Sequence, residues 1–340
     1  MQPTEPIEVS EKSVADLLLA MSKTGFQGRK LGEAFKVWLE MLEEDEITIL
    51  MGLAGAMVPA GMRKIIAYLI RNRYIDVLIS TGANLFHDIH EALGFRHYLG
   101  SENVDDFYLY NEGIDRIYDV FAYESEFNKV DCILADIISE LDGVVSSRKF
   151  IGELAARVYR LASEKESIIV AAYESGVPVF CPAIADSSIG IAAAIADRRV
   201  VIDTIKDVEE LTDIVVKSKK TGVIYVSGGV PKNFIQQTEV VARLKGVEKG
   251  GHDYAIQFTT DMPQWGGLSG CTFEEGISWG KISQKSKKVQ VHVDATIALP
   301  VIVHGLQNVK RRSCPVFIWD RELKIDYGCL SHEVSACQGL

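Results

Sequence analysis

Apolar residues follow two alternating patterns along most of the chain, one typical of buried strands and the other typical of helices. Unbroken apolar runs such as ITILMGLA at 47–54 are followed by segments with helical spacing, such as PAGMRKIIAYLIRN at 59–72. Unbroken runs are typical of strands that are buried on both faces, as in parallel sheets. The alternation predicts an α/β fold with a doubly wound, mostly parallel, Rossmann-like sheet.

The alternation is interrupted once and then resumes. Between residues 94 and 145 the spacing loosens, and we expect a connection that passes over the sheet, with a helix at 125–145 that ends near Asp142-Gly143. Each later strand is expected to lead through small or polar residues into a helix. These strands are predicted in the runs VPVFCP at 177–182, VVIDT at 200–204, GVIYVS at 222–227, DYAIQFTT at 253–260 and VQVHVDAT at 289–296.

The two ends of the chain differ from this central region. Helical spacing between residues 13 and 44 predicts an N-terminal helical segment, and the alternation is lost from KRRSCP at 310 onward. We therefore expect an N-terminal helical arm at 1–45, an α/β domain at 46–309 and a C-terminal extension at 310–340.

Composition and charge disfavour several classes of partner. The 340 residues are 47% hydrophobic and 24% charged, and the net charge of −11 argues against nucleic acid and anionic membrane as main partners. No apolar run reaches the ~18 residues of a membrane-spanning helix. The six cysteines include no CxxC pair, so they give no zinc signature and are expected as reduced thiols. These features predict a soluble cytoplasmic protein.

Small and polar residues follow the predicted strands. The carboxyl ends of parallel strands meet at one edge of a sheet, where ligands bind, and glycines and carboxylates there suit a nucleotide. Taken singly, each such residue is more commonly a turn former or a helix cap. The sequence contains neither GxGxxG nor GxxxxGK[ST], which argues against ATP hydrolysis by a P-loop. The residues concerned are Thr81, Asp186, Ser187, Ser188, Gly228, Gly229, Thr260, Asp261 and Asp294.

The segment WGGLSGCTFEEGISWGK at 265–281 carries the main candidate for chemistry. Thr272 and Glu275 have the spacing of a capping box, which predicts a short helix with Trp279 and Lys281 near its end. A lysine at such a place is commonly a solvated cation facing the helix dipole. The neighbouring indole and glycine instead favour a desolvated site, in which the amine is a nucleophile for Schiff-base chemistry. Lys281 is our candidate nucleophile.

Two histidines give a weaker indication of a metal site. His87 and His90 lie three positions apart on one face of a predicted helix, with Asp88 and Glu91 beside them. The spacing matches neither HExxH nor HxxEH. We therefore expect no metal here, but surface histidines or a cofactor contact.

The stretches EEGISWGKI at 274–282 and VHVDATIALP at 291–300 together resemble the active-site segment of deoxyhypusine synthases. The segments GFQGRKLG at 25–32 and NEGIDRI at 111–117 resemble this family as well, and the resemblance covers most of residues 25–305. It implies that NAD oxidises spermidine, that the butylamine portion passes to the lysine of SWGK as an imine, and that an acceptor amine then receives it. It also implies a homotetramer with active sites at a dimer interface.

The resemblance also implies residue roles. On the substrate side it assigns Glu275, Trp279 and Lys281. The positions that it assigns to NAD are Thr81, Asp186, Gly228, Gly229, Thr260, Asp294 and Ala295.

Four positions differ from the family pattern. Ile191 and Leu268 stand where two acidic residues of the family hold the spermidine ammonium, and apolar residues there would leave a buried ammonium uncompensated. Asn233 replaces the active-site histidine, and His87 replaces a glutamate. We therefore expect an altered donor preference, with His87 as the proton-transfer group.

The expected function is that of an NAD-dependent aminobutyl transferase. It would take the group from a polyamine through a lysine imine and pass it to a small amine, giving a homospermidine-type product. Two alternatives stay open: a deoxyhypusine synthase proper, which modifies a protein lysine, and a catalytically lapsed member that binds NAD or a partner subunit as a regulator. The intact SWGK segment favours an enzyme, whereas the missing acidic anchors favour a regulator.

Overall fold

Two compact units are present in the computed structural model, which describes residues 1–320 and 322–328. The first unit contains residues 1–54, 72–79 and the chain from 208 onward, and the second contains residues 55–71 and 80–207. Each unit therefore combines segments that are distant in the sequence. The three-part division expected from the sequence stays a prediction, because these units group segments by packing rather than by order along the chain.

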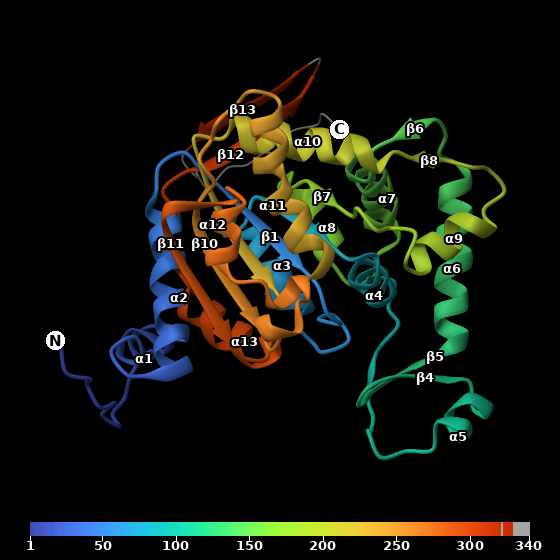
Figure 1. Cartoon of the computed structure of the whole chain (residues 1–340). Helices are drawn as coiled ribbons and strands as arrows, with labels where there is room; N and C mark the ends of the chain where they lie inside the picture. The colour runs from blue at the N-terminus through green and yellow to red at the C-terminus, as the bar shows by residue number, and fades with distance from the viewer. Residues whose placement is uncertain (321, 329–340) are drawn as a thin grey trace. The chain divides into compact units, whose positions relative to one another are not determined.

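A six-stranded sheet has the strand order β11-β10-β9-β1-β2-β7 (Figure 1). The pairs β1–β9, β9–β10 and β10–β11 are parallel. All residues of β1 are buried, as its unbroken apolar run predicts. The predicted α/β fold with a parallel sheet is therefore confirmed. The strands are β1 Ile47–Leu53, β2 Val77–Ser80, β7 Val179–Phe180, β9 Lys220–Val226, β10 His252–Thr259 and β11 Ile282–His292.

The predicted N-terminal helical segment is present in the first unit as α1 (Val14–Met21) and α2 (Phe26–Glu43). Trp38 and Met41 lie on the buried face of α2. Gly222 of β9 lets this helix approach closely, because a Cβ at that position would lie 2.8 Å from Met41 Sδ. Later elements of the chain are α10 Thr204–Lys217, α11 Gly229–Leu244, the short 3₁₀ helices η1 Pro263–Trp265 and η2 Leu268–Gly270, α12 Phe273–Ser278 and α13 Ala295–Gly305.

The second unit contains helices and two small sheets. β3, β4 and β5 form an antiparallel sheet, and β6 pairs in parallel with β8. The strands are β3 Tyr98–Leu99, β4 Ile114–Ile117, β5 Val120–Tyr123, β6 Val144–Val145 and β8 Val201–Ile202. The helices are α3 Arg63–Arg71, α4 Gly82–Ala92, α5 Asp106–Asn111, α6 Glu124–Ser139, α7 Ser147–Leu161, α8 Ile168–Ser175 and α9 Ser188–Ile195.

The structure differs from the sequence expectations in two places. Residues 94–145, expected as a connection with one helix at 125–145, contain α6 in that helical stretch but also the antiparallel sheet and α5, which were not expected. The run VVIDT forms β8, which pairs with β6 and does not join the six-stranded sheet. Val201 in this strand is exposed. An apolar run predicts a strand but carries no information about which strand it will pair with.

The chain after residue 309 forms an antiparallel hairpin of β12 (Cys314–Trp319) and β13 (Leu323–Gly328). The hydroxyls of Tyr327 in this hairpin and Thr48 in β1 lie 3.0 Å apart. The remainder of the expected C-terminal extension, residues 329–340, lies outside the described residues.

Candidate active site

Lys281 lies three residues after the end of α12 and directly before β11, rather than inside the helix. Gly280, at φ 71°, ends the helix in the left-handed conformation that favours glycine. The backbone N–H of Lys281 donates to the Gly276 carbonyl at 2.9 Å, and that of Gly280 donates to the Ile277 carbonyl at 2.9 Å. This glycine-terminated helix end sets the direction in which the Lys281 backbone leaves α12.

The half-buried amine of Lys281 has a neutral partner. Its Nζ lies 3.1 Å from Asn233 Oδ1 on α11 and 5.2 Å from the centre of the Trp279 ring. Asn233 stands where the family has a histidine, but the sequence does not predict its contact with Lys281. The two residues are 48 positions apart, so no local pattern could have paired them.

Glu275 takes part in the predicted capping box, which the structure confirms. Its Oε2 accepts from the Thr272 backbone N–H at 2.7 Å, and Thr272 Oγ1 accepts from the Glu275 backbone N–H at 3.1 Å. The hydrogen bond from Thr272 lowers the pKa of this exposed carboxyl. The carboxylate therefore holds the start of α12 in this structure.

Apolar side chains are exposed around this segment. Trp265, Leu268 and Trp279 are 75%, 37% and 62% exposed. Only contiguous exposed apolar surface marks a binding site, and single exposed apolar side chains are common. Ile191, the other apolar replacement, is exposed on α9 of the second unit.

The cofactor positions of the first unit directly follow strands β9, β10 and β11. Gly228 is closely packed, because a Cβ there would lie 2.5 Å from the Ser269 backbone, and the Gly229 N–H donates to Ser269 Oγ at 3.0 Å. Asp294 caps α13 through the Thr296 N–H at 2.7 Å. Thr260 and Asp294 remain exposed, and the two glycines have no side chain. Two glycines, an exposed hydroxyl and an exposed carboxylate after parallel strands fit a dinucleotide.

In the second unit the structure brings together the loops of Thr81 and Asp186. Thr81 caps α4, because its Oγ1 accepts from the Asn84 backbone N–H at 3.5 Å, and it also accepts from the Asn84 side-chain amide at 3.1 Å. The neighbouring Gly82 packs so closely on Ser187 that a Cβ would lie 2.2 Å from Ser187 Oγ. Asp186 itself is exposed.

His87 belongs to a chain of polar side chains in the second unit. Its Nδ1 lies 3.0 Å from His97 Nε2, and His97 Nδ1 lies 2.7 Å from Glu91 Oε1. Glu91 Oε2 also forms an ion pair with Arg63 Nε at 2.7 Å. Burial lowers the pKa of His87 to about 4, with the charge of His97 as a further cause. The imidazole is therefore neutral at physiological pH, and it is a weak base.

The residues that the structure describes contain no group of three or more histidine, cysteine or acidic side chains arranged to hold a metal ion. Within the same residues, no helix is both long and apolar enough to cross a membrane.

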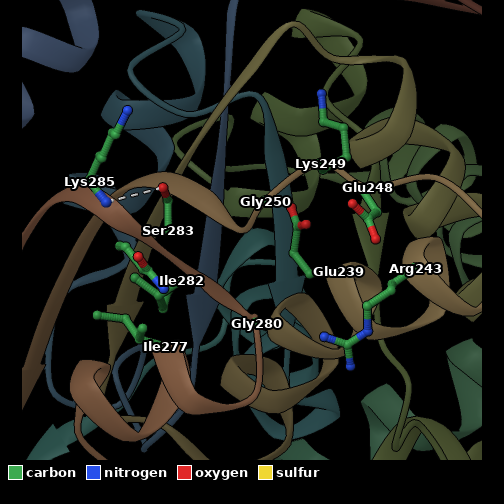
Figure 2. Close-up of a pocket in the computed structure, with 11 residues that line it drawn as sticks. Glu239, Arg243, Glu248, Lys249, Gly250, Ile277, Gly280, Ile282, Ser283 and Lys285 are labelled. Atoms are coloured by element: carbon green, nitrogen blue, oxygen red, sulfur yellow. Dashed lines mark hydrogen bonds between the residues drawn. The ribbon is translucent and has the colours of Figure 1, made fainter.

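A cavity of about 390 Å³ lies beside the Lys281 segment (Figure 2). Glu239, Arg243 and Gly280 are among its lining residues, but Lys281 is not. The Arg243 guanidinium is directed toward Gly280 and donates to the Trp279 carbonyl at 3.3 Å. This cavity is therefore separate from the candidate nucleophile.

Comparison with known proteins identifies the family. Residues 16–306 match the family model described as deoxyhypusine synthase. The chain is 73% identical over 297 residues to "Probable deoxyhypusine synthase 2" of Archaeoglobus fulgidus, covering 87% of this chain and 99% of that protein. It is 56% identical over 334 residues to the protein of the same name from Methanosarcina acetivorans, covering 96% of this chain and 97% of that protein.

Among solved structures, the chain is similar to that of a deoxyhypusine synthase candidate from Entamoeba histolytica. The TM-score is 0.60 at 19% identity, over 87% of this chain and 94% of the other. At this identity the similarity supports the fold alone. The family match and the close relatives show more: the chain belongs to the deoxyhypusine synthase family and is an enzyme of alkyl-group transfer.

Proposed function

We propose that this protein is an NAD-dependent aminobutyl transferase that acts on a polyamine donor through an imine on Lys281. The observation that carries the proposal is the setting of the Lys281 amine, which donates to the neutral oxygen of Asn233 and faces the Trp279 indole. A lysine with a neutral partner and partial burial is better suited to nucleophilic attack than one paired with a carboxylate.

The residues of this chain have distinct tasks in the proposed reaction. When bound, NAD would supply reversible hydride transfer, which makes the carbon next to the donor nitrogen electrophilic. The Lys281 amine attacks the resulting electrophilic carbon, and the remaining amine of the donor leaves with its electron pair and a proton. Asn233 orients the Lys281 amine, and Glu275 holds the helix that precedes it. Gly228, Gly229, Thr260 and Asp294 would hold NAD on the first unit.

Trapping the imine tests the nucleophile. With NAD and spermidine present, borohydride should leave an aminobutyl adduct on the peptide that contains Lys281, and Lys281→Arg should abolish it while calorimetry still detects NAD binding. Lys285→Arg, which replaces an exposed lysine four residues further on, is the matched control and should keep the adduct. An adduct of equal yield in Lys281→Arg would refute the assignment.

The donor and acceptor are the finer part of the proposal. With Ile191 and Leu268 at the family's anchor positions, a second ammonium of the donor would lack a charged partner, which costs several kcal/mol when the group is buried. We therefore expect a donor other than spermidine to react faster, and a small amine such as putrescine to accept the group. Assays should compare donors with and without an acceptor protein, with products separated by chromatography.

The outcomes of that assay separate the alternatives. Homospermidine from putrescine supports the proposal, whereas efficient labelling of a protein lysine from spermidine identifies a deoxyhypusine synthase proper. NAD binding without any adduct or product would indicate the regulatory alternative. His87 as proton-transfer group and the homotetramer stay predictions from the family resemblance; undiminished turnover in His87→Ala would dismiss the first, and light scattering checks the second.

A further inference from the structure

A buried carboxylate lines the cavity of about 390 Å³ that lies beside the Lys281 segment. Glu239, which belongs to α11, is only 4% exposed. Its Oε2 accepts from the Gly251 backbone N–H at 3.2 Å, whereas Oε1 has no hydrogen-bond partner among the described residues. Burial raises the pKa of this carboxyl to about 7. The carboxylate is therefore short of hydrogen bonds, although it borders a space that a ligand can fill.

The basic side chains near Glu239 do not compensate its charge. His252 Nδ1 lies 3.7 Å from Glu239 Oε1, but burial lowers the pKa of His252 to about 4, so this imidazole is neutral at physiological pH. The Lys249 ammonium donates to the Ser218 carbonyl. A buried carboxylate without a cationic partner is costly, so a positively charged ligand in the cavity would stabilise its ionised form.

Arg243 supplies the opposite charge on the same face of α11. It follows Glu239 by four positions, a spacing at which glutamate and arginine commonly form an ion pair. Within the described part of the chain these two side chains have other partners. The Glu239 carboxylate lies near Gly250, whereas the exposed Arg243 guanidinium is directed toward Gly280 and donates to the Trp279 carbonyl at 3.3 Å (Figure 2). The cavity is therefore lined by two opposite charges that do not neutralise each other.

The remaining walls and the position of the cavity favour a small organic ligand. Ile277 of α12 and Ile282, the first residue of β11, give it an aliphatic side. Its volume lies within the range of ~300–1,000 Å³ that is typical of small-molecule sites. The cavity lies where β10 and β11 begin, whereas the candidate cofactor positions follow the last residues of these strands. It is therefore distinct from the candidate NAD site.

We propose that this cavity binds an α-amino acid with an aliphatic side chain. Its ammonium would pair with Glu239, its carboxylate would pair with Arg243, and its side chain would contact the two isoleucines. A diamine would bring a second ammonium to Arg243, and a dicarboxylate would bring a carboxylate to Glu239. Like charges at such distances repel, so a ligand with one charge of each sign fits both residues. This binding activity goes beyond the proposed function and does not depend on it.

Three ligands with the same aliphatic group test the charge requirement. L-leucine has both charges, isoamylamine lacks the carboxylate, and isocaproate lacks the ammonium. Calorimetry with the full chain at about pH 8, above the pKa of the Glu239 carboxyl, should show leucine binding about tenfold or more tightly than either analogue. No binding of leucine at up to about 10 mM, or an analogue that binds equally well, would overturn the proposal.

Two variants locate the ligand in this cavity. Glu239→Gln removes the charge but keeps an oxygen for the Gly251 N–H, and Arg243→Gln removes the exposed guanidinium. Each should weaken leucine binding by about tenfold or more while thermal unfolding stays close to that of the wild type. Lys245→Gln, which removes an exposed charge just after α11, is the matched control and should bind leucine as the wild type does. Unchanged leucine affinity in either Glu239→Gln or Arg243→Gln would show that the ligand is not held as proposed.

Discussion

His90 is a histidine that behaves as an apolar ring. It is fully buried, its ring lies 5.3 Å from that of Phe95 and 4.9 Å from that of Phe127, and neither ring nitrogen has a hydrogen-bond partner among the described residues. Glu126 Oε2 lies 3.4 Å from Nε2, which would be an ion pair only with a protonated ring. Burial lowers the pKa of His90 to about 3, with the charges of His97 and His87 as further causes.

These lowered pKa values predict sensitivity to acid. Between about pH 6.5 and the folded-state values of about 4 for His87 and about 3 for His90, the unfolded chain binds protons that the folded chain does not. The free energy of unfolding therefore falls as the pH falls through this window. Asp88 acts in the opposite direction over part of it, because burial raises its pKa to about 6.

We expect His90→Phe to reduce this acid sensitivity. The free energy of unfolding lost between about pH 8 and about pH 5 should be smaller than in the wild type by on the order of 1–3 kcal/mol, because the variant has no imidazole to protonate. Urea unfolding at the two pH values measures the difference, in which a constant packing cost cancels. His304→Phe, at an exposed site, should leave the difference as it is. If His90→Phe and the wild type lost the same free energy of unfolding between the two pH values, this prediction would be wrong.

At the level of single elements, both ends of the short helix α12 determine where Lys281 lies. Its capping box begins the helix at Thr272, and its glycine end at Gly280 passes the chain to Lys281. A helix of this length has little stability of its own, so its ends determine its position. Glu275, which the family resemblance assigns to the substrate side, forms part of the capping box at the first of these ends.

Two substitutions separate the capping role of Glu275 from a role of its charge. Glu275→Gln keeps a side-chain oxygen for the Thr272 N–H and should retain nearly all adduct formation, whereas Glu275→Ala loses this contact and should be slower by about tenfold. The rate of the borohydride-trapped adduct is the measurement. Equal losses in both variants would instead assign the carboxylate charge to the substrate.

At the scale of the whole molecule, a buried ion pair joins the chain beyond residue 309 to the strands of the first unit. Arg311 and Asp76 are both buried, with Arg311 Nη1 2.6 Å from Asp76 Oδ1 and Nη2 2.7 Å from Oδ2. Arg311 Nη2 also donates to the Ile47 carbonyl at 3.0 Å, and Asp76 Oδ2 accepts from the Ile49 N–H at 2.8 Å. The residues expected as an extension thus contribute to the core of this unit.

Arg311→Met should therefore be strongly destabilising. Removing one partner leaves Asp76 buried with less compensation, which typically costs about 3–5 kcal/mol. Chemical unfolding measures the loss. Arg312→Met is the matched control, because its ion pair with Asp45 is largely exposed and should contribute about 0–1 kcal/mol. Similar small losses in the two variants would show that the chain beyond 309 does not contribute to the core.

The sequence by itself determined the features that depend on neighbours along the chain. Unbroken apolar runs identified the strands of the parallel sheet, the Thr272–Glu275 spacing identified the start of α12, and the SWGK segment identified the family. Helix caps arise from contacts over a few residues, and an apolar run marks a strand to be buried whichever elements cover it, so both patterns are readable along the chain.

The tertiary structure decided which distant side chains meet. It placed Asn233 on the Lys281 amine, joined His87 to His97, Glu91 and Arg63, and paired β8 with β6 instead of the main sheet. It also buried Lys232 among neutral acceptors, which its position on a helix did not indicate. Such contacts depend on how helices and strands pack, and many packings satisfy the same local pattern, so their partners became known only from the fold.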